Sequence, residues 1–319
     1  MKILVTGAAG FIGSHLAESL LKRGDTVIGV DNFNDYYSPA QKRANAALLA
    51  TYDRFAMIEA DVRDRPRMLA LCRDEEPDAI AHLAAMAGVR YAVERPEIYA
   101  EVNVSGTLNI LDGARQAGTR HVVFASTSSV YGGTDQIPFV ESDPCNRPLQ
   151  PYAATKKAGE VLGFSYHHLF GLSFTAVRFF TVYGPRGRPD MMAYLVLDSI
   201  FTGREIPLYN RGQMHRDWTF VDDIVAGVVA ALDRPLGYEI VNLGRGEPVL
   251  LSDFVSLIEE LAGRRANLVP APMLAADVRY TYADISRARH LLGYNPTVSV
   301  EEGVRRFWEW YRDRVVPNR

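Results

Sequence analysis

Short apolar runs alternate along the first half of the chain with segments whose apolar residues recur at helical spacing. Residues 2–6 form one such run, and Ile12, Leu16 and Leu20 follow it at intervals of four. Short runs of this kind are typical of strands that are buried on both faces. Further runs occupy residues 26–30, 56–60, 79–83 and 122–125. Strands that alternate with helices predict an α/β fold built on a doubly wound parallel sheet.

Helical spacing also marks the connections and the second half of the chain. Long helices are expected over residues 96–117 and 151–170, and a shorter helix begins near Ser38-Pro39. After Phe180 the alternation weakens. There we expect strands at residues 205–209 and 238–243, and helices at residues 190–201, 222–232, 252–261, 284–292 and 300–315. Ser252 is the expected N-cap of its helix, and Asp284 can cap the helix that follows it.

The chain of 319 residues is long enough for two lobes. We assign residues 1–180 to the first lobe and expect residues 220–246 to return to it. Residues 181–319 mainly form a smaller C-terminal α/β lobe. The expected strand at residues 238–243 is the segment that crosses back.

Composition narrows the functional class. Hydrophobic residues make up 48% of the chain and charged residues 23%, which is ordinary for a soluble globular protein. A net charge of −3 leaves no basic field for nucleic acid or anionic lipid. Two cysteines do not form a disulfide framework, and no apolar run is long enough to cross a bilayer. We therefore expect a mature cytoplasmic protein without a signal peptide, membrane span or metal site.

Glycines connect the first expected strand to the first expected helix. Gly7, Gly10 and Gly13 would allow a tight turn in which the backbone approaches a diphosphate at the helix N-terminus. Asp31 ends the next strand, where a carboxylate can accept hydrogen bonds from the adenosine ribose and would repel a 2′-phosphate. This pattern predicts NAD, not NADP, as the cofactor. The alternative is an ordinary tight turn followed by a solvated aspartate.

Tyr152 and Lys156 are spaced so that they share one face of a helix. A phenol with a pKa of about 10 is a poor base at neutral pH, and a nearby ammonium group would lower that value. The pair is therefore a candidate general base, although a tyrosine and a lysine also fall four apart by chance in many helices. Asp61, Ala84 and Thr127 follow other strands. Ligands bind at such carboxyl ends, so these positions predict one active site.

Several motifs together resemble a known superfamily. Residues 6–13 read Thr-Gly-x-x-Gly-x-x-Gly, a Ser/Thr cluster precedes Val130-Tyr131-Gly132, and Tyr152-x-x-x-Lys156 follows. These motifs resemble the extended short-chain dehydrogenase/reductase superfamily, which implies a Rossmann fold. Residues 31–37, 178–191 and 215–223 are similar to the UDP-glucuronate 4-epimerases of its nucleotide-sugar branch. The resemblance covers nearly the whole chain. It implies tightly bound NAD, a UDP-sugar substrate, and a homodimer paired through the helices at 96–117 and 151–170.

The resemblance also implies roles for individual residues. Tyr152 would be the base, Lys156 would bind the nicotinamide ribose, and Thr127 would hold the reacting hydroxyl. The substrate contacts that it implies are Ser128 and Ser129 at the sugar C6, Thr181 and Arg188 at the carboxylate, Tyr209 at the uracil and Arg216 at the diphosphate. The cofactor contacts, with Tyr152 and Lys156, are Gly7, Gly10, Phe11, Ile12, Gly13, Asp31, Asn32, Asp61, Val62, Leu83, Ala84, Ala85 and Asn103.

The reaction that these roles imply is C4 epimerisation through a transient 4-keto sugar. Related dehydratases and a decarboxylase carry an acid where this chain has Ser128 and Ser129. A 4-keto glucuronate is a β-keto acid and can lose CO₂, so its carboxylate must be held. Arg188 is a candidate for this role, because a guanidinium binds a carboxylate in a fixed plane.

Simpler readings of some residues stay open at this point. Arg188 could be a surface arginine, Tyr209 could pack at a strand end, and Asn103 could brace its helix. Met86 replaces a commoner glutamine, and residues 273–277 lack an expected Gln-Pro-Gly-Asp, for which Arg279 could compensate. Alternative functions are a UDP-glucose or UDP-N-acetylglucosamine 4-epimerase, or a nucleotide-sensing regulator with a dead site. Such regulators usually lose the tyrosine or the lysine.

Overall fold

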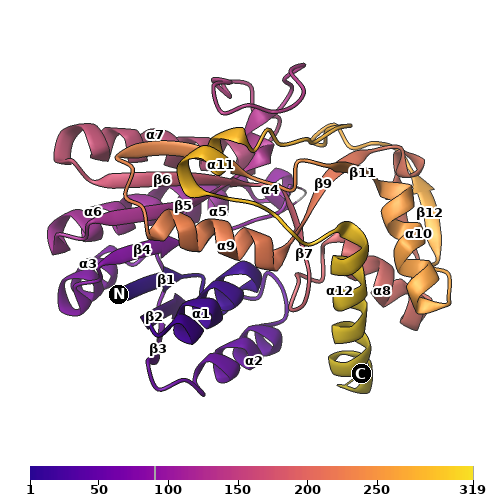
Figure 1. The fold of residues 1–319 in the computed structure, drawn as a ribbon, viewed down its shortest axis with the longest axis horizontal. Helices are drawn as coiled ribbons and strands as arrows, with labels where there is room; N and C mark the ends of the chain where they lie inside the picture. Colours follow the sequence, from indigo (N-terminus) through magenta and orange to yellow (C-terminus); the bar gives the residue numbers. More distant parts are fainter. Residues whose placement is uncertain (90, 319) are drawn as a thin grey trace.

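Seven parallel strands form the central sheet of the larger lobe (Figure 1). The computed structural model describes residues 1–89 and 91–318. The strand order is β10-β6-β5-β4-β1-β2-β3, so the chain starts in the middle of the sheet and winds outward in both directions. All six pairings are parallel. The strands are β1 (Lys2–Thr6), β2 (Thr26–Asp31), β3 (Phe55–Glu59), β4 (Ala79–His82), β5 (His121–Thr127), β6 (Ser173–Phe179) and β10 (Tyr238–Leu243).

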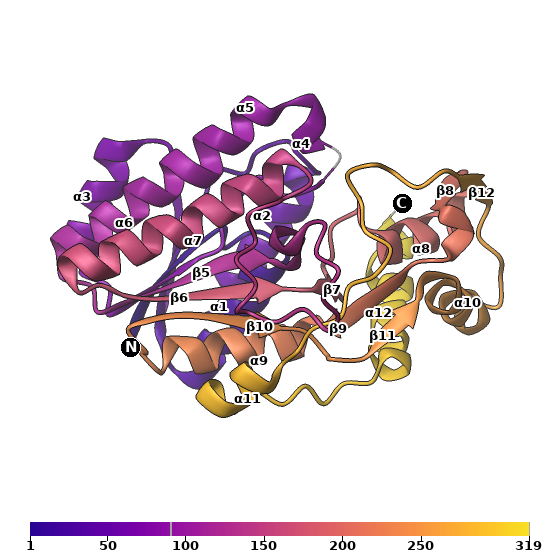
Figure 2. The same cartoon turned by 90° about the horizontal axis from the view of Figure 1, so that it is seen from above.

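Helices cover both faces of this sheet, as the doubly wound prediction requires (Figure 2). One face carries α1 (Phe11–Arg23), α9 (Val221–Leu232) and α11 (Ser286–Leu292), and α2 (Pro39–Leu49) packs against α1. The other face carries α3 (Arg65–Glu75), α6 (Thr107–Ala117) and α7 (Pro151–Phe170). The apolar runs of the strands are thereby buried on both sides, which explains their continuous hydrophobicity.

Two glycines allow α7 to pack unusually close to the sheet. A Cβ at Gly159 would lie 2.4 Å from Phe124, and one at Gly163 would lie 2.3 Å from Phe174. The two phenylalanine rings stack with their centroids 5.7 Å apart. The helix that carries Tyr152 and Lys156 is therefore seated directly on β5 and β6, and its position is fixed by side-chain size.

The segment between β4 and α6 differs from the single regular helix expected over residues 96–117. It consists of α4 (Tyr91–Glu94), α5 (Pro96–Tyr99) and a π-helical segment, η1 (Ala100–Gly106), which runs into α6. A π turn holds one residue more than an α turn, and such segments often occur at functional sites. Asn103 lies inside η1, and its contacts are described below.

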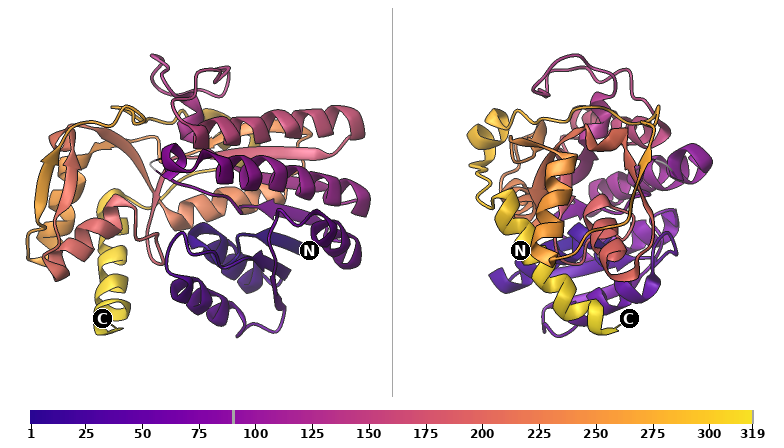
Figure 3. Two further views of the ribbon diagram at one scale, coloured as in Figure 1. Left: turned by 180° about the vertical axis from the view of Figure 1, so that it is seen from behind. Right: turned by 90° about the vertical axis from the view of Figure 1, so that its right-hand side faces the viewer.

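In the part of the chain that the structure describes, the smaller lobe contains two short sheets and three helices. It lies beside the larger lobe in Figure 3. Its first sheet is formed by β7 (Thr181–Tyr183), β9 (His215–Phe220) and β11 (Pro248–Leu250), and its second by β8 (Ile206–Tyr209) and β12 (Leu268–Ala271). Its helices are α8 (Met192–Thr202), α10 (Leu251–Ala262) and α12 (Val300–Arg314). Short helical turns occupy η2 (Ser128–Tyr131), η3 (Asn210–Gly212) and η4 (Val316–Asn318).

The prediction that Ser252 caps α10 is wrong. The helix begins at Leu251, directly after β11, and Leu250 is its N-cap without a side-chain hydrogen bond. Ser252 therefore lies inside the first turn, where its hydroxyl donates to Asp253 at 3.4 Å. At α11, Asp284 does accept a hydrogen bond from the backbone N–H of Ser286, at 2.8 Å.

The return of residues 238–243 to the main sheet is confirmed. These residues form β10, which pairs with β6 from Tyr238 opposite Phe174 to Leu243 opposite Phe179. Helices α9 and α11 also pack on the larger lobe. We therefore infer a division in which residues 1–180 and about 220–246, with α11, form the first lobe. In the part of the chain that the structure describes, no helix is long and apolar enough to span a membrane.

Candidate active site

A cavity of about 680 Å³ lies at the carboxyl ends of the central strands, between the two lobes. Its wall combines the glycine loop after β1, the ends of β2, β4 and β5, the start of α7, and parts of the smaller lobe. The volume is in the range of small-molecule sites. Apart from Asn103, every residue that the sequence led us to expect in the site lines this cavity.

The glycine loop has the geometry that a dinucleotide diphosphate requires. Gly7 has φ +70°, and a Cβ there would lie 2.8 Å from the backbone nitrogen of Ala84. A Cβ at Gly13 would lie 2.0 Å from the carbonyl oxygen of Gly7. Gly10 is the N-cap of α1 and offers no side-chain cap hydrogen bond to the first turn of the helix. These residues fit NAD.

The two acidic residues that the sequence analysis assigned to the cofactor, Asp31 and Asp61, both line the cavity. Asp31 is buried, and its carboxylate accepts from the backbone N–H groups of Ala9 (3.1 Å) and Phe33 (2.9 Å). Burial raises the pKa of Asp31 although both bonds oppose the shift. Asp61 accepts from Asn32 at 2.9 Å and is paired with Arg63 at 2.8 Å. Burial opposes ionisation of Asp61, but the bonds from Arg63 and Asn32 lower its pKa to about 2.

Asn103 does not line the cavity, which differs from the cofactor contact implied by the resemblance. Its side chain is fully buried, accepts from the backbone N–H of Met86 at 2.9 Å and donates to the Met86 carbonyl at 3.0 Å. It also donates to Thr155 at 3.1 Å. The amide is thus committed to the chain itself. Asn103 braces the loop of Met86, which does line the cavity, against α7.

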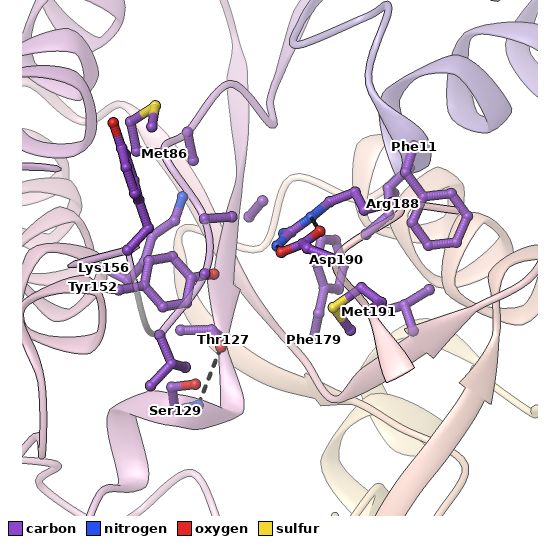
Figure 4. A pocket seen from close by; sticks show the side chains of 18 of the residues that line it. Phe11, Met86, Thr127, Ser129, Tyr152, Lys156, Phe179, Arg188, Asp190 and Met191 are labelled. Carbon is purple, nitrogen blue, oxygen red and sulfur yellow. Dashed lines mark hydrogen bonds and ion pairs between the residues drawn. The ribbon is translucent and has the colours of Figure 1, made fainter. Parts of the chain in front are cut away.

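The catalytic candidates come together on one wall of the cavity (Figure 4). Tyr152 and Thr127 lie next to each other on this wall, and the Thr127 hydroxyl is among the groups that act to lower the pKa of Tyr152. The Thr127 oxygen also accepts from the backbone N–H of Ser129 at 3.1 Å, which fixes the first turn of η2. Lys156 lies one turn further along α7, 2% exposed, with its Nζ 4.7 Å from the centre of the Phe124 ring.

The protonation of this wall differs from the simple expectation that Lys156 lowers the pKa of Tyr152. Burial raises the pKa of Tyr152 above 10, and the two effects that oppose it are the hydrogen bond to Thr127 and the charge of Arg188. Burial also lowers the pKa of Lys156 to about 7, so this lysine is close to half protonated at neutral pH. The positive charge that acts to lower the pKa of Tyr152 is that of Arg188.

Arg188 lies on the opposite wall, facing the Tyr152 side across the cavity (Figure 4). Its Nε and Nη2 donate to the two oxygens of Asp190 at 3.0 and 2.6 Å. Tyr36 donates its hydroxyl to the same carboxylate at 3.0 Å. The side chain of Arg188 is 19% exposed, so the interpretation as a free surface arginine is wrong.

The far end of the cavity is formed by the smaller lobe. Arg216 lies there, donating to Asp277 at 2.8 Å and to the carbonyl of His215 at 2.8 Å. Burial lowers the pKa of Arg216. Tyr209 also lines the cavity, as do Leu274, Ala276, Asp277 and Val278. Arg279 is not a lining residue; its carbonyl accepts from the backbone N–H of His215 at 2.9 Å.

Several lining residues were not assigned a role from the sequence. They are Tyr36, Tyr37 and Lys42 after β2, and Asp190 beside Arg188. Lys42 is 4% exposed and donates to the carbonyl and side chain of Asn34, each at 2.7 Å. Tyr36 and Tyr37 belong to the motif at residues 31–37 that resembles the epimerases, so their presence in the site could have been predicted. The contacts of these tyrosines could not be predicted from the motif alone.

Comparison with known proteins agrees with this geometry. Residues 3–244 match the NAD dependent epimerase/dehydratase family. A UDP-glucuronate 4-epimerase of Thermodesulfobacterium geofontis is 42% identical, over 98% of this chain and 96% of that one. The structure of a Bacillus cereus UDP-glucuronic acid 4-epimerase with UDP-glucuronic acid and NAD is 34% identical. It superposes with a TM-score of 0.91 over 98% of this chain and 99% of that one.

A UDP-glucose 4-epimerase of Thermus thermophilus, solved with NAD, is also similar in structure. It is 31% identical and superposes with a TM-score of 0.89 over 99% of this chain and 100% of that one. The glycine loop, the Tyr152–Thr127 pair and these matches over nearly the full length agree with one another. The chain belongs to the NAD dependent epimerase/dehydratase family.

Proposed function

We propose that this protein interconverts UDP-glucuronate and UDP-galacturonate by NAD-dependent epimerisation at C4. The observation that carries the proposal is that the half-buried Tyr152 and the buried Thr127 stand together on one wall of a cavity and face an arginine across it. A hydroxyl group of the sugar can then meet a base on one side while a carboxylate meets a guanidinium on the other. Relatives named as UDP-glucuronate 4-epimerases, more than 40% identical over nearly the whole chain, support the same substrate.

The chain's own residues perform the proton transfer. Tyr152 accepts the proton of the sugar 4-hydroxyl and later returns it to the 4-keto oxygen, which is general base and then general acid catalysis. Thr127, beside Tyr152 on the same wall, holds that hydroxyl in line for the transfer. Bound NAD supplies the hydride acceptor and donor. Lys156 holds the nicotinamide ribose, and Ser128 and Ser129 hold the C6 end of the sugar.

The positions of the carboxylates in the cavity favour epimerisation over elimination. Residues 127–129 carry only hydroxyl groups. Among the described residues that line the cavity, the carboxylates are those of Asp31, Asp61, Glu94, Asp190 and Asp277. Asp190 is paired with Arg188 and Asp277 with Arg216. No carboxylate in this set belongs to the Thr127–Ser129 turn, where a dehydratase would place its acid.

Control of the carboxylate completes the proposed mechanism. The 4-keto intermediate loses CO₂ only if the bond to its carboxylate aligns with the ketone π system. Arg188 and Thr181, which both line the cavity, would hold the carboxylate out of that alignment. At the other end of the substrate, Arg216 would bind the diphosphate and Tyr209 would lie beside the uracil.

The test gives the purified protein UDP-glucuronate without added NAD and follows the sugar by proton NMR. We expect UDP-galacturonate, which reports substrate, C4 chemistry and retained cofactor together. UDP-pentose and CO₂ would show that the intermediate decarboxylates. No reaction even with added NAD, together with turnover of UDP-glucose or UDP-N-acetylglucosamine, would replace the uronate by a neutral hexose. Turnover of none of these sugars would favour a regulator.

The enzyme is further proposed to be a homodimer. Large apolar side chains are exposed along α6 and α7, at Leu108 (36%), Val161 (54%), Phe164 (51%) and Leu169 (66%). Pairing of these helices across a two-fold axis would bury them. A mass of one chain in light scattering at micromolar concentration would refute the dimer. Phe164→Glu should dissociate it, because a carboxylate would enter the apolar interface.

The cytoplasm is the proposed compartment. Cys72 and Cys145 are buried, unpaired thiols. Burial raises the pKa of each to about 11, so both stay protonated and weakly reactive at neutral pH. The chain therefore gains no stability from an oxidising environment. Fractionation of the native organism would test this assignment.

A further inference from the structure

Two motifs from distant parts of the sequence meet at Arg188. Tyr36 follows β2, and Asp190 lies 154 residues later in the chain. The Tyr36 hydroxyl donates to Oδ2 of Asp190 at 3.0 Å. The same oxygen accepts from Arg188 Nη2 at 2.6 Å, while Oδ1 accepts from Nε at 3.0 Å. Arg188 and Asp190 thus form a fork-to-fork pair whose carboxylate is oriented from a different segment.

Tyr36 itself is held tightly. Its ring lies 5.3 Å from the ring of Tyr91 and 6.4 Å from that of Tyr37. Gly88 has φ +120°, and a Cβ there would lie only 2.2 Å from the Tyr36 hydroxyl oxygen. The guanidinium of Arg188 stacks over the Tyr36 ring, 5.5 Å from its centroid. Tyr36 therefore touches both members of the ion pair, one through its hydroxyl and one through its ring.

The guanidinium of Arg188 has five N–H groups, and Asp190 accepts hydrogen bonds from only two of its three nitrogen atoms. Asp190 takes the edge formed by Nε and Nη2, and the guanidinium also interacts with the Tyr36 hydroxyl. Arg188 lies over the cavity with Tyr152 on the opposite wall (Figure 4). A carboxylate that enters the cavity would meet a guanidinium whose plane is already set by Asp190 and Tyr36.

We infer that Tyr36 and Asp190 are positioning residues that fix the Arg188 guanidinium and thereby set the preference for an acidic sugar over a neutral one. The inference rests on the proposed function, because Arg188 must bind the uronate carboxylate. A guanidinium held in one plane also holds that carboxylate in one plane. The same two residues therefore restrain the 4-keto intermediate against decarboxylation.

If only net charge mattered, removing the Asp190 carboxylate would have the opposite effect on UDP-glucuronate affinity. The inference can therefore be tested by the direction of that effect. Asp190 cancels the charge of Arg188, and its own charge repels a second carboxylate. If net charge decided, Asp190→Asn would bind UDP-glucuronate more tightly. If orientation decides, the same variant binds it more weakly, because the arginine loses its fixed plane. The sign of the change in affinity distinguishes the two.

The experiment compares two variants with two matched controls on the NAD-loaded enzyme. Asp190→Asn removes the carboxylate that pairs with Arg188 through two hydrogen bonds. Tyr36→Phe removes only the hydroxyl group that orients this carboxylate. Glu97→Gln is the control for Asp190→Asn. Glu97 also pairs with an arginine two residues before it, Arg95, at 2.5 Å, but this pair lies on the exposed surface. Tyr166→Phe breaks another tyrosine-to-aspartate hydrogen bond, of 2.6 Å, outside the cavity. Titration gives the Kd of UDP-glucuronate and of UDP-glucose, and NMR gives the share of turnovers that end in CO₂.

We expect Asp190→Asn to weaken UDP-glucuronate binding about 10- to 100-fold, as loss of one oriented charge-assisted contact does. UDP-glucose binding should stay within about twofold, and the share of turnovers that lose CO₂ should rise. Tyr36→Phe should show the same pattern more weakly, and both controls should match the wild type.

Three outcomes would overturn the inference. Tighter UDP-glucuronate binding in Asp190→Asn would show that charge, not orientation, decides. An equal loss of affinity for UDP-glucuronate and for UDP-glucose would show that Tyr36 and Asp190 have only a structural role. A wild-type enzyme without preference for UDP-glucuronate would refute the proposed function, and the inference with it. The first two outcomes leave the proposed function intact, so the two failures are distinguishable.

Discussion

Replacing Lys156 by methionine should stabilise the cofactor-free protein while it abolishes most of the activity. Lys156 is 2% exposed, and its ammonium lies over the Phe124 ring. Methionine has a similar length and no charge to desolvate, so it suits such a position. A residue that serves the reaction at a cost in stability is an expected feature of an active site.

The magnitude follows from the two protonation equilibria. Burial lowers the pKa of Lys156 from 10.5 to about 7. The folded chain therefore binds fewer protons than the unfolded chain between pH 7 and pH 10.5, and its free energy of unfolding rises with pH in that window. The full difference corresponds to about 4 to 5 kcal/mol. The advantage of the methionine variant should thus fall from about 4 kcal/mol at pH 7 to about 1 kcal/mol at pH 10.

Urea unfolding of the NAD-free wild type and of Lys156→Met, at several pH values, measures this advantage. Other titrating groups cancel in the difference between the two proteins. Lys22→Met is the control, since the Lys22 side chain is 62% exposed and its bond to Glu18 raises its pKa. Its difference from the wild type should not change between pH 7 and pH 9. A Lys156→Met difference that is equally flat would refute the reasoning.

Three further perturbations test other parts of the site. Tyr152→Phe should lower turnover by about 10²- to 10⁴-fold with NAD content unchanged, and wild-type rates in NMR assays would exclude it as the base. Gly13→Ala would bring a Cβ within 2.0 Å of a carbonyl oxygen and should abolish cofactor retention, measured as NAD per chain. Gly133→Ala, whose nearest contact would be an ordinary 3.6 Å, should retain it. Glu160→Gln removes the negative charge that pairs with the fully buried Arg178 at 2.8 Å and should cost about 3 to 5 kcal/mol in urea unfolding. A cost below about 1 kcal/mol would show that the pair adds little.

The elements that could be predicted from sequence are those with a strong local pattern. The buried strands of the larger lobe read as apolar runs, and α7 was predicted with its observed bounds, Pro151–Phe170. Strands such as β9 (His215–Phe220) have mixed polarity, because they pair within a small sheet at the edge of a cavity. The π-helical segment at Ala100–Gly106 has no pattern that separates it from an α-helix.

The residues of the site also fall into those that could be predicted from the sequence and those that could not. Residues whose role depends on backbone geometry, such as Gly7 and Asp31, could be placed from their position between elements. Asp190 and Tyr36 could not, because their contact joins residues 154 positions apart. The direction of the pKa shift of Tyr152 was also misjudged, because spacing along a helix shows that Lys156 is near but not that desolvation acts on both side chains.

The late return of β10 has a consequence for how the protein is made. Strand β6 (Ser173–Phe179) lies between β5 and β10, and β10 is complete only at Leu243. While the ribosome synthesises the residues between them, one edge of β6 has no partner. Open strand edges promote aggregation of partly made chains. The vulnerable interval of biosynthesis thus spans the first half of the smaller lobe, and a premature stop there would release a chain whose largest sheet lacks its last strand.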